Sequence, residues 1–206
     1  MQKFLIIVLV LINLSSVTKA DDIKDFEIEG FYIGDSLLET YSEEALQPYK
    51  RFMPGKFSII SIPSSDYNGP LITVDTSLIT KKFKDYDSLD FYIKNNDKKF
   101  IIYAIGGIIF YKNQIKKCNV KKSEVVNSIE EALNIKFITG KLKHQLDSSG
   151  KSIQYQSYVM LENNSNIRVE CYDWTDKMKK KHNVEDLLQI GVISNEVQKW
   201  VESGYN

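Results

Sequence analysis

The two cysteines of this 206-residue chain constrain its fold more than any other feature, because they lie on patterns of different period. Cys118 lies three residues after Ile115, on the apolar side of a segment with helical spacing. Cys171 continues Val169 at a spacing of two, as on one face of a strand. A bridge between the two cysteines would therefore join a helix to the sheet that it covers.

The N-terminal segment indicates where the chain resides. A charged start at Lys3 precedes the apolar run Phe4–Leu14 and a stretch of small residues that ends at Ala20. This order is typical of a secretory signal peptide. A membrane-spanning helix needs roughly 20 apolar residues, and we expect no stable membrane insertion after cleavage. We expect residues 1–20 to be a signal peptide, the mature chain to begin at Asp21, and the protein to be periplasmic or secreted.

Export decides between two interpretations of the cysteines. Buried free thiols are common in cytosolic proteins, where they act as small apolar side chains. Exported proteins meet an oxidising compartment in which disulfides persist. We therefore predict a disulfide between Cys118 and Cys171.

Charge excludes two classes of partner. Removing residues 1–20 takes away Lys3 and Lys19 and leaves 25 basic and 27 acidic residues. Proteins dedicated to nucleic acids show a basic face or a high pI, and proteins of anionic membrane surfaces carry polybasic segments. The nearly balanced charge argues against both. The length predicts one domain over residues 21–206.

Periodicity predicts a single α+β domain, with antiparallel sheet or sheets covered by one longer amphipathic helix and by short terminal helices. The longer helix falls within 113–133, where Lys122 is the only polar break in the apolar side. Capping serines predict short helices near 35–47 and after Ser194. Alternation and turn residues predict strands at 57–62, 71–74, 89–93, 99–111, 153–161, 167–174 and 187–193.

Gly106 and Gly107 interrupt the most apolar of these strands. A glycine inside a buried strand indicates a bulge or a close approach by another part of the chain. We predict a bulge there, with Ile108 and Phe110 still directed toward the core.

One loop holds the residue types of a serine hydrolase. A working triad converges from separate elements, and the G-x-S-x-G turn of many hydrolases does not occur here. We interpret the loop as solvated or partner-facing, and keep as an alternative a small periplasmic hydrolase that uses the loop with Asp173 or Asp176. The four residues of the loop are His144, Asp147, Ser148 and Ser149.

Motifs for metals and cofactors are incomplete. Gly150-Lys151-Ser152 resembles the end of a phosphate-binding loop, but position 145 is Gln, where that motif needs Gly. The aspartates at 85, 87 and 90 miss the Gly of a calcium loop. With His144 and His182 as the only histidines, zinc ligands are also few. We predict no metal and no cofactor.

The best binding candidate is the end of the strand that contains Cys171. Tyr172, Asp173 and Trp174 combine aromatic rings with a carboxylate, and aromatic anchors mark contact sites. The alternative is that Trp174 packs under a loop. The basic run Lys177–Lys181 is interpreted as a solvated loop.

Four phrases of the sequence resemble a family of small exported proteins from AT-rich marine bacteria. The resemblance implies export and a shared fold, and it implies no activity. The phrases are FEIEG with IGDSLL from residue 26 to residue 38, GIIFYKN at 107–113, SGKS at 149–152 and CYDW at 171–174.

Together these observations predict an exported, non-enzymatic accessory or binding protein. Its partner is not identified by the sequence, and another envelope protein is one candidate. We expect the partner to contact the sheet or the Tyr-rich loops, and we do not expect nucleic acid.

Overall fold

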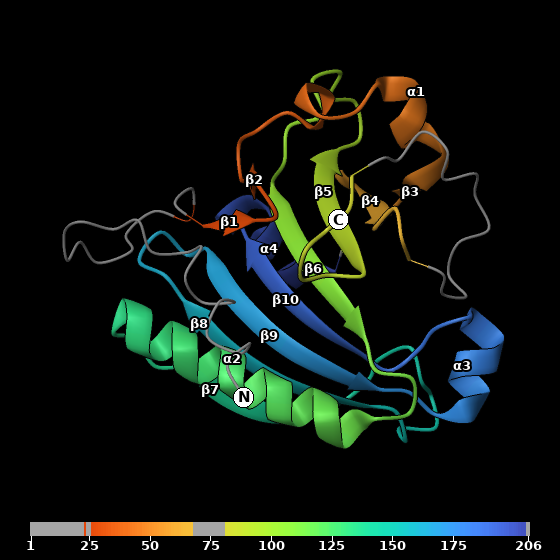
Figure 1. The fold of residues 1–206 in the computed structure, drawn as a ribbon, viewed down its shortest axis with the longest axis vertical. Helices are drawn as coiled ribbons and strands as arrows, with labels where there is room; N and C mark the ends of the chain where they lie inside the picture. Colours follow the sequence, from red (N-terminus) through yellow and green to blue (C-terminus); the bar gives the residue numbers. More distant parts are fainter. Residues whose placement is uncertain (1–22, 24–25, 68–80, 205–206) are drawn as a thin grey trace.

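The computed structural model describes Ile23 and residues 26–67 and 81–204 (Figure 1). The signal segment and the strand predicted at 71–74 lie outside these residues. The strands are β1 (Glu27–Ile28), β2 (Phe31–Tyr32), β3 (Lys50–Phe52), β4 (Phe57–Pro63), β5 (Ser88–Lys94), β6 (Ala104–Phe110), β7 (Ile138–Lys143), β8 (Ile153–Met160), β9 (Asn166–Asp173) and β10 (Leu187–Ile193). The α-helices are α1 (Glu43–Leu46), α2 (Ile115–Leu133), α3 (Asp176–His182) and α4 (Asn195–Glu202), and two 3₁₀ turns lie at Leu37–Glu39 and Gln47–Tyr49.

The strands confirm the predicted α+β class. β1 and β2 form a small hairpin, and the other eight form one antiparallel sheet in the order β3-β4-β5-β6-β10-β9-β8-β7. The predicted hairpins β5–β6 and β8–β9 are both present. The last strand, β10, pairs with both β6 and β9 and so joins the two hairpins into one sheet.

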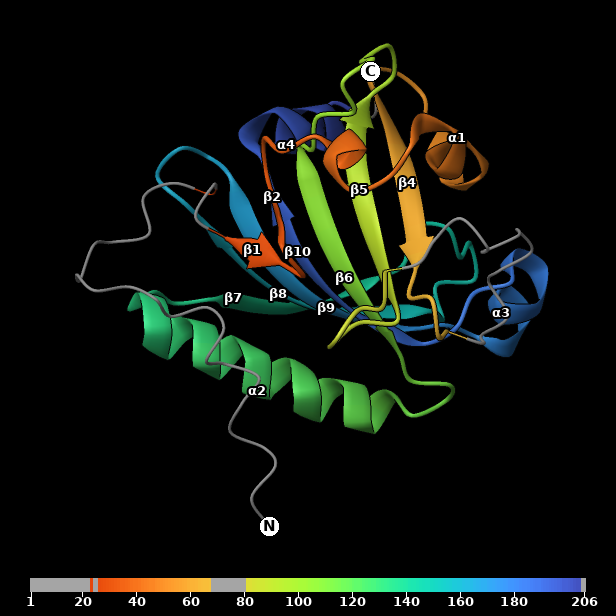
Figure 2. The ribbon, with the colours of Figure 1, turned by 45° about the horizontal axis from the view of Figure 1, so that its top comes forward.

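Helix α2 lies across one face of β9 and β10, as Figure 2 shows. Its buried side carries Cys118, which forms the predicted disulfide with Cys171 at a Cα–Cα distance of 6.1 Å. Both cysteines lie in a cluster of buried apolar residues. Lys122, the polar break in the helical pattern, is also buried, and its Nζ donates to the Ser157 hydroxyl at 2.9 Å. The helix is thus tied to the sheet by one covalent bond and one buried hydrogen bond.

The short helices cover other parts of the sheet. Ser42 and Ser194 cap α1 and α4 as predicted, each accepting a hydrogen bond from a backbone N–H three residues later. In α4, Val197 and Trp200 pack against Phe57 on the sheet. The apolar residues of α1 join the main core, which includes β4 and β5. These contacts cover the β4–β6 end of the sheet, α2 packs against β9 and β10, and α4 also reaches β9 through hydrogen bonds of Gln198.

The glycine bulge predicted in β6 is wrong. Gly106 and Gly107 pair in regular register with both β5 and β10. The glycines are instead explained by close approach, since a Cβ on Gly107 would lie 2.3 Å from the ring of Tyr86. Ile108 and Phe110 share one face of β6, as alternation requires, and Ile108 is buried there while Phe110 is half-buried. The opposite face is also covered, because Ile105 and Ile109 join the core clusters.

Two elements were not predicted. The Lys177–Lys181 run belongs to helix α3, which Thr175 caps and which buries Met178. Edge strand β7 follows α2 and pairs only with β8. No helix in the described residues is long and apolar enough to cross a membrane.

Candidate functional site

The candidate site is the sheet face that points away from α2. Since antiparallel partners point to the same side and neighbours alternate, the register assigns one set of residues to this face. We call it the open face: the even positions of β7 (138–142), β8 (154–160) and β9 (166–172), and the odd positions of β10 (187–191). Its three exposed large apolar side chains are Ile138, Leu142 and Met160, which are 60%, 48% and 43% exposed.

A polar network fixes the middle of the open face. Glu170 is buried, and its carboxylate accepts hydrogen bonds from the Tyr172 hydroxyl at 2.8 Å and from Gln154 Nε2 at 3.0 Å. Burial first, and the Glu170 charge second, raise the pKa of Tyr172. The phenol therefore stays protonated and keeps donating to the carboxylate, which holds both side chains in one arrangement.

An arginine lies beside this network. The Arg168 guanidinium donates from Nε to Asn166 Oδ1 at 3.0 Å and from Nη2 to Gln198 Oε1 at 2.6 Å. Both acceptors are neutral amides. Gln198 belongs to α4, so this helix helps to position the arginine over the sheet.

An aromatic cluster closes one end of the open face. The ring of His144 lies 4.0 Å from that of Trp174 and 5.6 Å from that of Tyr172, measured between centroids. Trp174 is buried under the β7–β8 loop, and its indole N–H has no partner among the described residues. Burial lowers the pKa of His144. The cluster is therefore an apolar end wall of the face, in which a neutral histidine ring packs on tryptophan.

The β7–β8 loop is organised around Asp147. Its carboxylate accepts hydrogen bonds from the hydroxyls of Ser149 and Ser152, both at 2.6 Å. These bonds lower the pKa of Asp147. His144 Nδ1 accepts from the Leu146 N–H at 3.2 Å. Because Ser149 already donates to Asp147 and His144 Nδ1 is occupied, these bonds hold the turn together and do not form a nucleophile–base pair.

The three predicted binding residues separate into two groups. Tyr172 and Trp174 lie together at the aromatic end, with ring centroids 6.0 Å apart. Asp173 lies between them in sequence and so points to the other side of the sheet. Burial, and then repulsion from Asp186, raise the pKa of Asp173.

Helix α3 is locked beside this end of β9. Lys179 Nζ forms a largely buried ion pair with Asp186 at 2.8 Å. The other carboxylate oxygen of Asp186 accepts the Trp174 backbone N–H at 2.9 Å. Asp176, the other carboxylate weighed for a hydrolase, lies in the first turn of α3. The basic run therefore anchors the strand end that carries Trp174.

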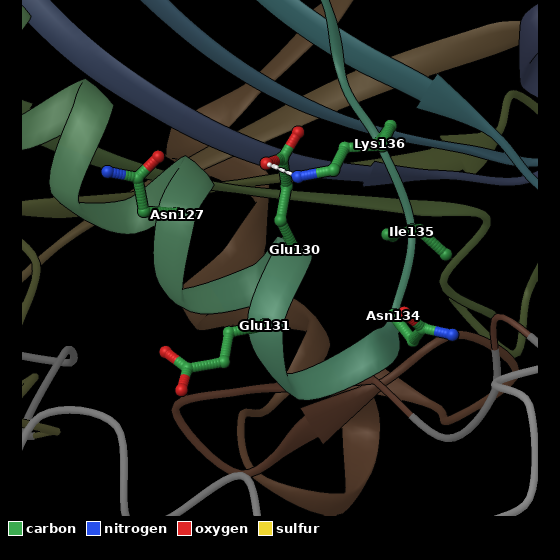
Figure 3. A pocket seen from close by; sticks show the side chains of 6 residues that line it. All are labelled: Asn127, Glu130, Glu131, Asn134, Ile135 and Lys136. Atoms are coloured by element: carbon green, nitrogen blue, oxygen red, sulfur yellow. Dashed lines mark hydrogen bonds and ion pairs between the residues drawn. The ribbon is translucent and has the colours of Figure 1, made fainter.

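A separate pocket of about 490 Å³ lies at the C-terminal end of α2 (Figure 3). Its most prominent charge is already satisfied, because Glu130 pairs with Lys136 at 2.8 Å and accepts the Phe137 N–H at 2.8 Å. We therefore interpret the pocket as part of the C-terminal capping structure of α2. Six residues line it: Asn127, Glu130, Glu131, Asn134, Ile135 and Lys136.

No group of three or more histidine, cysteine or carboxylate side chains within the described residues is placed to hold a metal ion. Comparisons with protein-family models, with curated proteins and with solved structures find no match to the chain. Any functional conclusion therefore depends on the geometry of the open face.

Sequence reasoning missed Arg168, Glu170 and Gln154. The signal was present, because polar residues recur at a spacing of two in the strands that hold them. The predictions from alternation rest on the apolar residues alone, and the polar residues of the same strands alternate with them.

Proposed function

We propose that this chain is an exported, non-enzymatic binding protein that holds its ligand or partner on the open face. The observation that carries the proposal is the composition of that face. It holds three of the seven exposed large apolar side chains of the described residues. The polar groups in the middle of the same face are held in place by hydrogen bonds to one another. Exposed apolar patches rimmed by polar groups are typical of interaction sites.

Two further features support export. The N-terminal sequence has the order of a secretory signal. The Cys118–Cys171 disulfide is typical of proteins from oxidising compartments.

The test compares two exposed apolar sites. In one variant, Ile138→Thr and Leu142→Thr remove the apolar groups from β7 but keep residues that suit a strand. The control is Val120→Thr on α2, which is 61% exposed and lies outside the open face. Each protein is used for affinity capture from the native envelope, and bound molecules are identified by mass spectrometry.

We expect one set of bound molecules to be shared by the wild type and Val120→Thr and lost from the β7 double variant. An identical set for all three proteins would refute binding at the open face. Hydrolysis of a generic ester, peptide or glycoside by the wild type, abolished by His144→Ala, would instead establish the hydrolase alternative.

A further inference from the structure

Arg168 is held in position without being neutralised. Its two acceptors are the amide oxygens of Asn166 and Gln198, and Asn166 Nδ2 donates to the same Gln198 oxygen at 2.8 Å. Asn166 is fully buried, and Gln198 is largely buried, so the arrangement is rigid. Within residues 26–67 and 81–204, no carboxylate forms an ion pair with Arg168. A fixed guanidinium with unused N–H donors is suited to an external anion.

The sheet leaves space beside this guanidinium. The residue opposite Arg168 on β10 is Gly191, and the residue opposite Gly191 on β6 is Gly106. Among the described residues, and apart from its chain neighbours, a Cβ on Gly191 would have within 4 Å only the Ile105 carbonyl oxygen, at 3.7 Å. The Gln189 side chain lies over Gly106, so among the described residues the uncovered surface next to the arginine is at Gly191 itself.

The charges around Arg168 favour a ligand with a single negative charge. Glu170 is two residues from Arg168 on the same face, roughly 7 Å along the strand. Glu202 accepts a hydrogen bond from Gln198, which itself binds the arginine. A phosphate dianion would be repelled by these carboxylates, whereas a carboxylate presents one charge and matches the guanidinium fork.

Apolar groups continue from the arginine toward the sheet edge. Tyr158 is opposite Arg168 on β8, and Ile138 is opposite Tyr158 on β7. Met160 lies on the same face of β8 and is exposed. Two strand spacings of about 4.8 Å give an apolar path of roughly 10 Å, which suits an alkyl chain of medium length.

We propose that Arg168 anchors the carboxylate of an amphipathic ligand whose alkyl tail lies over Tyr158, Met160 and Ile138. This inference depends on the proposed function, since it names the class of ligand for the open face.

Decanoate is a suitable probe, because it has one carboxylate and a tail of the required length. Its Kd is measured by calorimetry, and amide shifts in ¹⁵N-labelled protein locate the site. Decanamide replaces the charged head by a neutral one, and acetate removes the tail. The variants are Arg168→Gln, Arg168→Lys and, as a matched control, Arg51→Gln, which changes the only other arginine of the chain.

We expect decanoate to bind the wild type and Arg51→Gln equally and to shift the Gly191 amide. Arg168→Gln should weaken binding roughly 10- to 100-fold, as expected for lost hydrogen bonds to a charged group. Arg168→Lys should also weaken it, because lysine keeps the charge but loses the fork. Decanamide and acetate should each bind at least about tenfold more weakly.

Three results would overturn the inference: no binding of decanoate, equal binding of decanoate and decanamide, or equal losses in Arg51→Gln and Arg168→Gln. Urea unfolding shows whether each variant is folded. If Arg168→Gln does not fold, the affinity of Arg168→Lys for decanoate decides whether the inference holds. A captured ligand that Arg168→Gln retains and the Ile138→Thr, Leu142→Thr variant loses would refute the carboxylate site but support the proposed function. If both variants retain the captured ligand, the carboxylate site and the proposed function are both refuted.

Discussion

Breaking the Cys118–Cys171 disulfide should remove a large part of the stability of the fold. The bridge joins residues 53 apart in sequence, so its loss frees a long loop in the unfolded chain. The chain-entropy relation gives about 4 kcal/mol for a loop of this length at 25 °C. Domains are typically stable by about 5–15 kcal/mol, so the reduced protein should remain folded but unfold at much lower denaturant.

Three samples separate the loop effect from packing. The oxidised wild type, the reduced wild type and the Cys118→Ala, Cys171→Ala variant are unfolded in urea, with tryptophan fluorescence as the signal. Both cysteines are fully buried, so the alanine variant also loses packing and should be less stable than the reduced wild type. With a slope of about 2 kcal/mol per molar urea, the midpoint of the reduced wild type should fall by about 2 M.

The result that would refute this reasoning is a loss below about 1 kcal/mol on reduction. That value would mean that α2 and β9 are held by packing alone and that the unfolded chain gains little freedom. As an independent check, alkylation of denatured but unreduced native protein should label neither cysteine.

Two further predictions concern single side chains. Gly107→Ala would force the Tyr86 ring to move and should cost about 1–3 kcal/mol in urea unfolding; Gly140→Ala, whose Cβ would have its nearest neighbour at 3.6 Å, is the control and should change stability by less than about 0.5 kcal/mol. Equal effects would show that the close approach of Tyr86 does not explain the glycine. Burial lowers the pKa of His144, so below about pH 6.5 the unfolded chain binds a proton that the fold excludes. Stability should therefore fall as the pH drops from about 7 to 5, and less steeply in His144→Gln; an unchanged slope in His144→Gln would contradict this.

The sequence predicted those parts of the fold that depend on apolar periodicity. Helix α2, the two hairpins, β10 and the helix after Ser194 were all found, because each buries a regular apolar pattern. The disulfide was also predictable, since each cysteine lies on the buried side of its own pattern.

Elements stabilised by their neighbours were not predictable in this way. Strand β7 has the sequence ITGKLK, in which glycine and lysine disfavour strands, and its conformation is set by pairing with β8. Helix α3 has one buried residue, Met178, and a basic run that resembles a solvated loop. Its position depends on the ion pair between Lys179 and Asp186. Asp186 lies 7 residues further along the chain, and no periodic pattern relates the two residues.

The open face differs from both cases, because the information needed to find it was already in the disulfide prediction. If Cys171 faces the helix, alternation requires Glu170 and Tyr172 to face away from it. The same alternation places Arg168 beside Glu170. A strand that buries a cysteine on one side and presents arginine, glutamate and tyrosine on the other is not merely solvated, since ordinary solvent faces do not need a fully buried asparagine to hold an arginine in place. The polar half of the pattern therefore holds the residues of the proposed site, and the apolar half determines the face on which they lie.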